Sequence, residues 1–119
     1  MLADSRLHPR VVTSLEVKVG THGDNTHARI IDISLGGVTI KGDGELAQAL
    51  ALENSQGEGG EHQLSFDLPS QAFSKLCRLV HVRRLSQIEY EFGLKFLELN
   101  LNDVAAISDY INNHVRRAG

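Results

Sequence analysis

The sequence has no tryptophan, one cysteine, two prolines and no long apolar run, and these absences exclude several classes of protein. The lone Cys77 cannot form a disulfide within the chain, and residues 1–5 lack the basic and apolar segments of a signal peptide. A reduced, cytoplasmic protein is therefore expected. No stretch approaches the roughly 18 apolar residues of a membrane-spanning helix, so no membrane insertion is expected either.

An excess of positive charge is also missing, because 12 lysines and arginines are set against 15 aspartates and glutamates. The net charge of −3 argues against DNA, RNA or an anionic membrane as a general partner, since such binders rely on a basic field. A small nucleic-acid-binding barrel would also need exposed stacking aromatics, and the chain has only four phenylalanines and two tyrosines. Any anion site must therefore be local, and the core is expected to be aliphatic.

What the sequence does contain is alternating apolar and polar residues, the pattern of half-buried strands. Strands are expected over residues 11–19, 26–33, 38–40, 64–68, 73–85 and 90–96. In the fifth run the alternation slips between Leu79 and Val80, which predicts a bulge or bend. Six short strands separated by turns predict an antiparallel β-barrel or closed sheet, in a single domain at this length.

The N-terminal segment departs from this pattern. Residues 1–10 have no apolar period, and Pro9 keeps His8 out of the helical region. A flexible, extended arm is therefore expected before a domain of residues 11–119.

Helical signals appear in two later segments. From Asn102 the apolar period becomes 3.6, which predicts a C-terminal α-helix capped by Asn102 or Asp103 and packed against the sheet. Residues 45–53 fit either a short helical turn or a loose strand, and the glycines of 54–61 predict a flexible loop.

Two groups of polar residues stand out. Asp32 and Ser34 lie at the end of the second strand, and Gly37 lies in the turn after it, where glycine permits a positive φ or the close approach of a flat ligand. Asp32 and Ser34 are two residues apart, which on a strand places both side chains on one face about 6.5 Å apart. Upstream, Arg6 and Arg10 supply two guanidinium groups, which span about 13 Å in an extended arm.

These residues form two signatures, RxxxR followed about one hairpin later by DxSxxG, and the late strand Tyr90–Phe96 contains a G-x-x-F pattern. In this order and separation the chain resembles the PilZ domain family, bacterial receptor modules for cyclic di-GMP. The resemblance covers Arg6 to Val115, nearly the whole chain. It implies a six-stranded antiparallel β-barrel with a C-terminal helix, which binds cyclic di-GMP as a ligand, needs no cofactor and relays the signal to an unidentified effector protein.

The resemblance carries the family's binding positions over to Arg6, Arg10, Asp32, Ser34, Gly36 and Gly37. A guanidinium group fits the O6 and N7 edge of guanine, and it also fits phosphate oxygens. The Asp32 carboxylate would accept from the N1 and N2 donors of guanine, Ser34 would bond a phosphate or a base, and the glycines would let the backbone approach. Without the resemblance, Asp32 and Ser34 are ordinary turn residues.

Four further residues are secondary candidates. His81 lies where related proteins present a side chain that packs on guanine, although a core or surface histidine is the more common role. Arg83 and Arg84 are either solvated charges at a strand edge or phosphate contacts. Ser5 stands where relatives that capture a stacked pair of ligands have an arginine, so one ligand per chain is expected.

Other functions find less support. Ser34 lacks the leading glycine of a G-x-S-x-G nucleophile elbow, so neither a catalytic residue nor an enzyme activity is expected. His22, Asp24 and His27 cluster at a hairpin tip without a fourth ligand nearby, so no metal site is expected. The remaining alternative is a PilZ-fold adaptor that docks on a protein partner without binding nucleotide.

Overall fold

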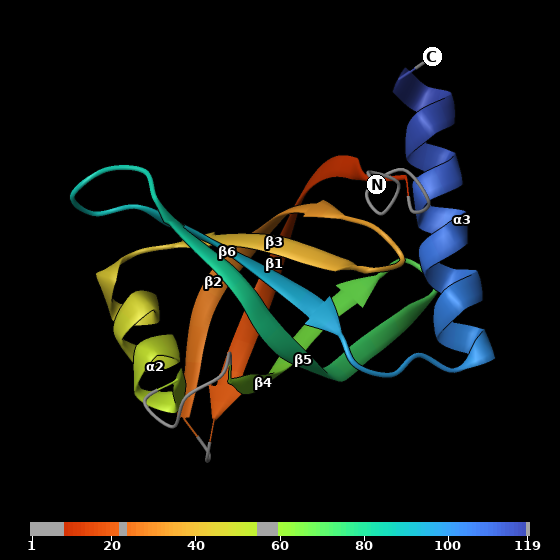
Figure 1. Ribbon diagram of the computed structural model, residues 1–119. Helices are drawn as coiled ribbons and strands as arrows, with labels where there is room; N and C mark the ends of the chain where they lie inside the picture. The colour runs from red at the N-terminus through yellow and green to blue at the C-terminus, as the bar shows by residue number, and fades with distance from the viewer. Residues whose placement is uncertain (1–8, 22–23, 55–59, 119) are drawn as a thin grey trace, which may run out of the picture.

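The computed structural model describes residues 9–21, 24–54 and 60–118, which form a closed antiparallel β-barrel with flanking helices (Figure 1). The strands follow one another around the barrel in the order β1-β2-β3-β6-β5-β4. They are β1 (Val11–Thr21), β2 (Asp24–Ile33), β3 (Gly37–Gly42), β4 (Glu61–Leu68), β5 (Gln71–Arg84) and β6 (Tyr90–Phe96). The predicted six-stranded barrel is confirmed, and each predicted strand overlaps one of these.

Strand pairing separates the residues into inward and outward rows. Leu79, Leu94, Val38 and Ile33 are successive partners on β5, β6, β3 and β2, and all of them are buried. Because side chains alternate along a strand, the residues directly before and after this inward row point outward. The register of β5 against β6 shifts between Leu79 and His81, which confirms the predicted bulge.

The barrel interior is mainly aliphatic, but it also contains every phenylalanine of the chain. Phe66 and Phe73, partners on β4 and β5, stack with their ring centroids 5.1 Å apart. The expectation of an aliphatic core is therefore incomplete, because large rings contribute much of the area buried in a small barrel. Burial raises the pKa of the Cys77 thiol to about 12, so this thiol stays protonated at neutral pH.

Residues 45–53, which by sequence fit either a short helical turn or a loose strand, belong to helix α2 (Gly44–Asn54). Asp43 caps the helix, because its Oδ1 accepts the backbone N–H groups of Glu45 at 3.0 Å and Leu46 at 3.2 Å. Leu46 and Leu50 are buried where α2 packs against β2 and β3.

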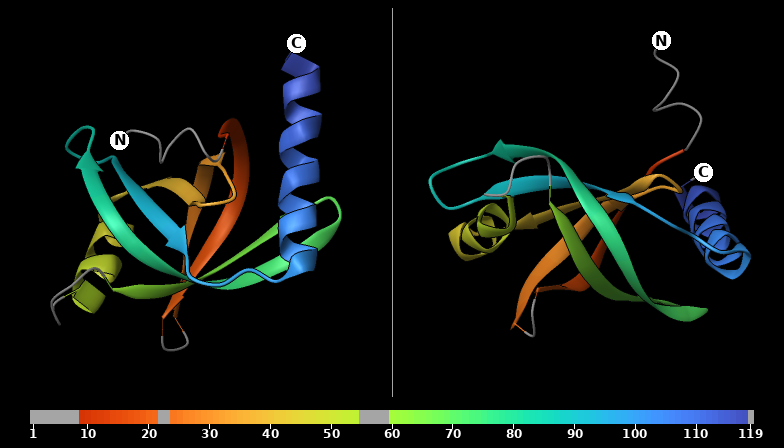
Figure 2. Two further views of the ribbon diagram at one scale, coloured as in Figure 1. Left: turned by 45° about the vertical axis from the view of Figure 1, so that its right-hand side comes forward. Right: turned by 60° about the horizontal axis from the view of Figure 1, so that its bottom comes forward.

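Helix α3 (Leu101–Ala118) lies on the opposite side of the barrel from α2 (Figures 1 and 2). Its cap is Asn100, so the predicted caps Asn102 and Asp103 are wrong. Asn100 Oδ1 accepts the N–H of Asp103 at 2.8 Å, and Asp103 Oδ2 accepts the N–H of Asn100 at 2.9 Å. This reciprocal capping box fixes the start of the helix.

The apolar face of α3 packs on the barrel. Ile107 and Ile111 of the predicted apolar stripe are buried, and so is Tyr110, whose hydroxyl hydrogen-bonds that of Thr13 on β1. Within the described ranges, no helix has the length and apolar character needed to cross a membrane.

Candidate ligand-binding face

The outer face of β2, β3, β6 and β5 carries a line of residues that we call the motif row. Asp32 pairs with Thr39, Thr39 with Gly93, and Gly93 with His81, so the row crosses all four strands. Neighbouring strands are about 4.8 Å apart, which separates Asp32 from His81 by roughly 14 Å. This width suits an extended ligand with two ends better than a single small ion.

Asp32 stands at one end of the motif row beside Arg10, which precedes β1. Arg10 Nη1 lies 3.5 Å from Asp32 Oδ1, and the two side chains are 54% and 20% exposed. The contact is not a hydrogen bond, and Asp32 Oδ1 is buried without a hydrogen-bond partner among the described residues. A donor group of a ligand can satisfy such an oxygen when the side chain moves out of this conformation. Arg6 and Ser5 lie outside the described residues, and their roles stay predictions.

The turn after β2 is held by its own hydrogen bonds. Ser34 Oγ accepts the N–H of Gly36 at 3.0 Å, and the N–H of Ser34 donates to the Gly37 carbonyl at 2.9 Å. The Gly36 carbonyl accepts the N–H of Phe96 on β6 at 3.0 Å. Because Ser34 is only 2% exposed, its hydroxyl shapes the turn in this conformation and is not accessible to a ligand.

Gly37 is required by the packing of the barrel itself. A Cβ at this position would lie 2.0 Å from the carbonyl oxygen of Leu94 on β6, closer than such atoms can approach. The glycine therefore permits β3 to pair with β6. It also leaves bare backbone on the outer face beside the motif row.

His81 occupies the other end of the motif row. A Cβ on its partner Gly93 would lie 2.2 Å from His81 Cε1 and 2.4 Å from its Nδ1, so the imidazole fills the space above the glycine. His81 is nevertheless exposed to solvent. The outer face thus presents an aromatic ring supported by β6, a surface on which a base can stack.

The two adjacent arginines of β5 have different surroundings. Arg83 is 71% exposed, and its Nη1 lies 4.0 Å from Glu91 Oε1. Arg84 donates from Nε to the Ser86 carbonyl at 2.9 Å, and its guanidinium lies over the Tyr90 ring, 5.6 Å from the centroid. Arg84 therefore stabilises the β5–β6 hairpin, whereas Arg83 follows His81 on the outer face.

Sequence reasoning missed Thr39 and Lys95 as members of this face. Thr39 lies between Asp32 and Gly93 and is buried, whereas Lys95 lies two residues beyond Gly93 and is exposed. Alternation along each strand could have shown that both point outward. Their neighbours depend on the cross-strand register, which local patterns do not reveal.

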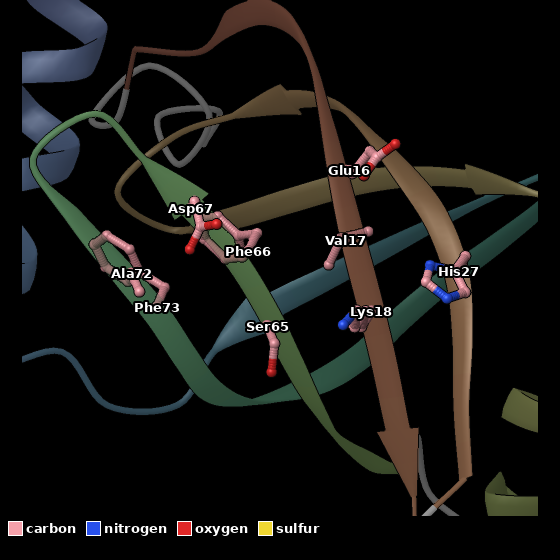
Figure 3. Close-up of a pocket in the computed structure, with 9 residues that line it drawn as sticks. All are labelled: Glu16, Val17, Lys18, His27, Ser65, Phe66, Asp67, Ala72 and Phe73. Carbon is pink, nitrogen blue, oxygen red and sulfur yellow. The ribbon is translucent and has the colours of Figure 1, made fainter.

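A separate cavity of about 360 Å³ lies between β1 and β4 (Figure 3). Phe66 and Phe73 contribute to its apolar part, and Lys18 and His27 lie around it. None of the described residues of the two predicted motifs lines this cavity. Among the described residues, no group of three or more side chains could hold a metal ion. Because His22 lies outside them, the expected absence of a metal site stays a prediction.

Comparison with known families and sequences gives one match. The family model of the PilZ domain matches residues 4–113, which is most of the chain. No curated protein matches the sequence.

Solved structures share the fold at low sequence identity. The PilZ domain of YcgR from Escherichia coli with c-di-GMP has a TM-score of 0.68 at 15% identity, covering 93% of this chain and 92% of that one. The K. pneumonia MrkH–c-di-GMP complex has a TM-score of 0.72 at 18% identity, covering 93% and 52%. The Bacillus subtilis inhibitor of motility (MotI/DgrA) has a TM-score of 0.70 at 15% identity, covering 92% and 51%. The chain thus spans about half the length of MrkH and MotI.

Proposed function

The chain belongs to the PilZ domain family, a family of non-enzymatic cyclic di-GMP receptors, and we propose that this chain binds cyclic di-GMP through its own two motifs. The observation that carries the proposal is the meeting of Arg10, from RxxxR, with Asp32, from DxSxxG, at one end of the motif row. Loss of either residue would favour an adaptor without nucleotide. Both are present, and they are in contact.

Each end of the motif row offers chemistry that suits a guanine. At one end the Asp32 carboxylate accepts from the N1 and N2 donors, and Arg10 supplies paired donors for the O6 and N7 edge or for a phosphate. At the other end the His81 ring offers a stacking surface. Ser34 acts through the turn, where its hydroxyl holds the N–H of Gly36.

The arm and the β5 strand add further cations. Arg6 lies four residues before Arg10 in the arm and brings a second guanidinium to the ligand. Arg83, two residues beyond His81 on the outer face, is available for a phosphate, whereas Arg84 is engaged in the hairpin. Bound ligand, arm and barrel together form a surface that an effector protein recognises. Ligand binding therefore increases the population of the state that the effector binds, and no chemical step is involved.

Isothermal titration calorimetry of the purified chain with cyclic di-GMP tests this proposal. Saturable binding of one ligand per chain is expected, because Ser5 does not supply the extra arginine of relatives that take a stacked pair. GTP has one guanine and cannot span both ends of the motif row, so it should bind much more weakly. Absence of any cyclic di-GMP binding would favour the adaptor that binds no nucleotide, and two ligands per chain would refute the stoichiometry.

Replacing Gly93 by alanine should weaken cyclic di-GMP binding by about fivefold or more, since stacking of a base on an aromatic side chain is worth roughly 1–3 kcal/mol. The added methyl group would displace the His81 ring from its place over β6. His81→Ala should weaken binding by a similar factor, and the double variant should be no weaker than either single one.

Gly44→Ala is the matched control, because a Cβ at Gly44 would meet no atom within 4 Å. Calorimetry should give this variant the affinity of the wild type. The same result for Gly93→Ala would show that the position of the His81 ring does not matter for binding.

A further inference from the structure

A second outward row lies beside the motif row and consists of Gly37, Lys95 and Arg78. Lys95 pairs with Gly37 on one side and with Arg78 on the other, so two cations stand opposite each other. Like charges in opposite positions of an antiparallel pair destabilise it. Arg78 is compensated by Glu61, whose Oε2 lies 3.1 Å from Arg78 Nη2. Lys95 forms no ion pair with any residue that the structure describes.

We propose that Lys95 is a phosphate anchor of the ligand site, with Arg78 as the second cation behind it; the inference rests on the proposed binding of cyclic di-GMP. The Lys95 side chain is exposed, and an anion beside it gains a charge-assisted contact without breaking an existing ion pair. Gly37 leaves the adjacent position on β3 free of any side chain. A phosphate there also relieves the repulsion between the two cations.

The position of Lys95 fits the layout of a cyclic dinucleotide. The two phosphates of such a ligand lie in the ring that joins its two guanines. With one guanine near Asp32 on β2 and the other near His81 on β5, that ring lies over the two intervening strands, β3 and β6. Lys95 is on β6, two residues and about 7 Å along the strand from Gly93, a distance that the four-carbon stem of lysine bridges.

The charge balance of the chain favours such a local anchor. The net charge of −3 supplies no general attraction for a dianionic ligand. On the outer face, Arg83 lies near Glu91 and Arg78 near Glu61, so their carboxylate partners offset much of their charge. Lys95 has no such carboxylate partner among the described residues.

Calorimetric titration of Lys95→Gln with cyclic di-GMP tests the anchor. The variant should bind at least about tenfold more weakly than the wild type, because a charge-assisted contact is lost. This difference should shrink as sodium chloride is raised, since salt screens the lost charge. Lys95→Arg should retain most of the affinity, because a guanidinium group also binds phosphate. Lys18→Gln is the control, because it removes the same charge from an exposed position on β1 and should leave the affinity unchanged.

Thermal unfolding without ligand separates a binding role from a structural one. Lys95→Gln should melt at or slightly above the temperature of the wild type, because it removes a contact between like charges. A clearly lower melting temperature would contradict the inference. If the wild type binds cyclic di-GMP and Lys95→Gln binds it with equal affinity, the role of Lys95 as an anchor is overturned and the proposed function stays intact. Absence of binding by the wild type would overturn both.

Discussion

Alanine in place of Asp32 is expected to weaken cyclic di-GMP binding at least about tenfold, because it removes a charge-assisted contact worth roughly 1.5–3 kcal/mol. Arg10→Ala should have an effect of the same size, since it removes the other half of the contact between the motifs. Stability should change little. The ion pair of Arg10 and Asp32 is at the surface, and such pairs contribute at most about 1 kcal/mol.

The matched control for this experiment is Asp67→Ala. Asp67 is an exposed carboxylate on β4, so its loss changes the net charge equally without touching the motif row. Calorimetry should give Asp67→Ala the affinity of the wild type. Suppose that the wild type binds cyclic di-GMP and that Asp32→Ala and Arg10→Ala bind it equally tightly. The assignment of the binding site to the two motifs is then wrong.

Asp103→Ala is expected to lower the free energy of unfolding by about 3 kcal/mol, since it breaks a buried ion pair and a helix cap. The Asp103 side chain is 3% exposed and lies 2.5 Å from Lys75 Nζ. It also accepts a hydrogen bond from Gln71 at 3.0 Å and forms the capping box with Asn100. Its removal leaves Lys75 without its carboxylate, and the melting temperature should fall by roughly 10 °C.

This contribution to stability should depend on pH. Burial by itself raises the pKa of Asp103, but hydrogen bonds from Lys75, Asn100 and Gln71 and the charge of Lys75 outweigh it, so the pKa of the folded state lies below 3.8. A carboxyl group with a lowered pKa stabilises the fold above its unfolded-state pKa and loses this effect as the pH falls through the folded-state value. The difference between wild type and Asp103→Ala should thus be constant near neutral pH and shrink below about pH 4.

Urea denaturation at pH 7 measures the loss in Asp103→Ala directly. Asp109→Ala is the control, because Asp109 is an exposed carboxylate on the same helix. The control should change the free energy of unfolding by less than about 0.5 kcal/mol. Equal stability of Asp103→Ala and the wild type would show that the network around this carboxylate does not hold α3 on the barrel.

The strands were predictable because one face of each is buried, which imposes a period of two on the sequence. The bulge after Leu79 was predictable for the same reason, since one extra residue reverses the alternation. Helix α2 was not, because its apolar residues have little helical periodicity, and Leu46 and Leu50 are its only described side chains that are fully buried. The cap of α3 was misplaced because Asn100 and Asn102 are equally good caps, and the loop after β6 decides between them.

The candidate site was predictable only where a local pattern carries it. Asp32 and Arg10 belong to short motifs, and the barrel brings them within 3.5 Å of each other. The burial of Ser34 and the engagement of Arg84 in its hairpin are tertiary effects that neither motif contains. Lys95 was missed because its proposed role depends on its neighbours Gly37 on β3 and Arg78 on β5. The pairing register that brings them together is set by the whole barrel.

Two-dimensional ¹H–¹⁵N NMR during a titration with cyclic di-GMP locates the ligand most directly. The backbone amide signals of Thr39, Gly93 and Lys95, on β3 and β6, should shift progressively until the protein is saturated. The signals of Ser65 and Ser74, partners on β4 and β5 away from the motif row, should stay in place. Shifts confined to β1 and β4 around the cavity of Figure 3, or no shifts at saturating ligand, would contradict a site on the outer face of β2, β3, β6 and β5.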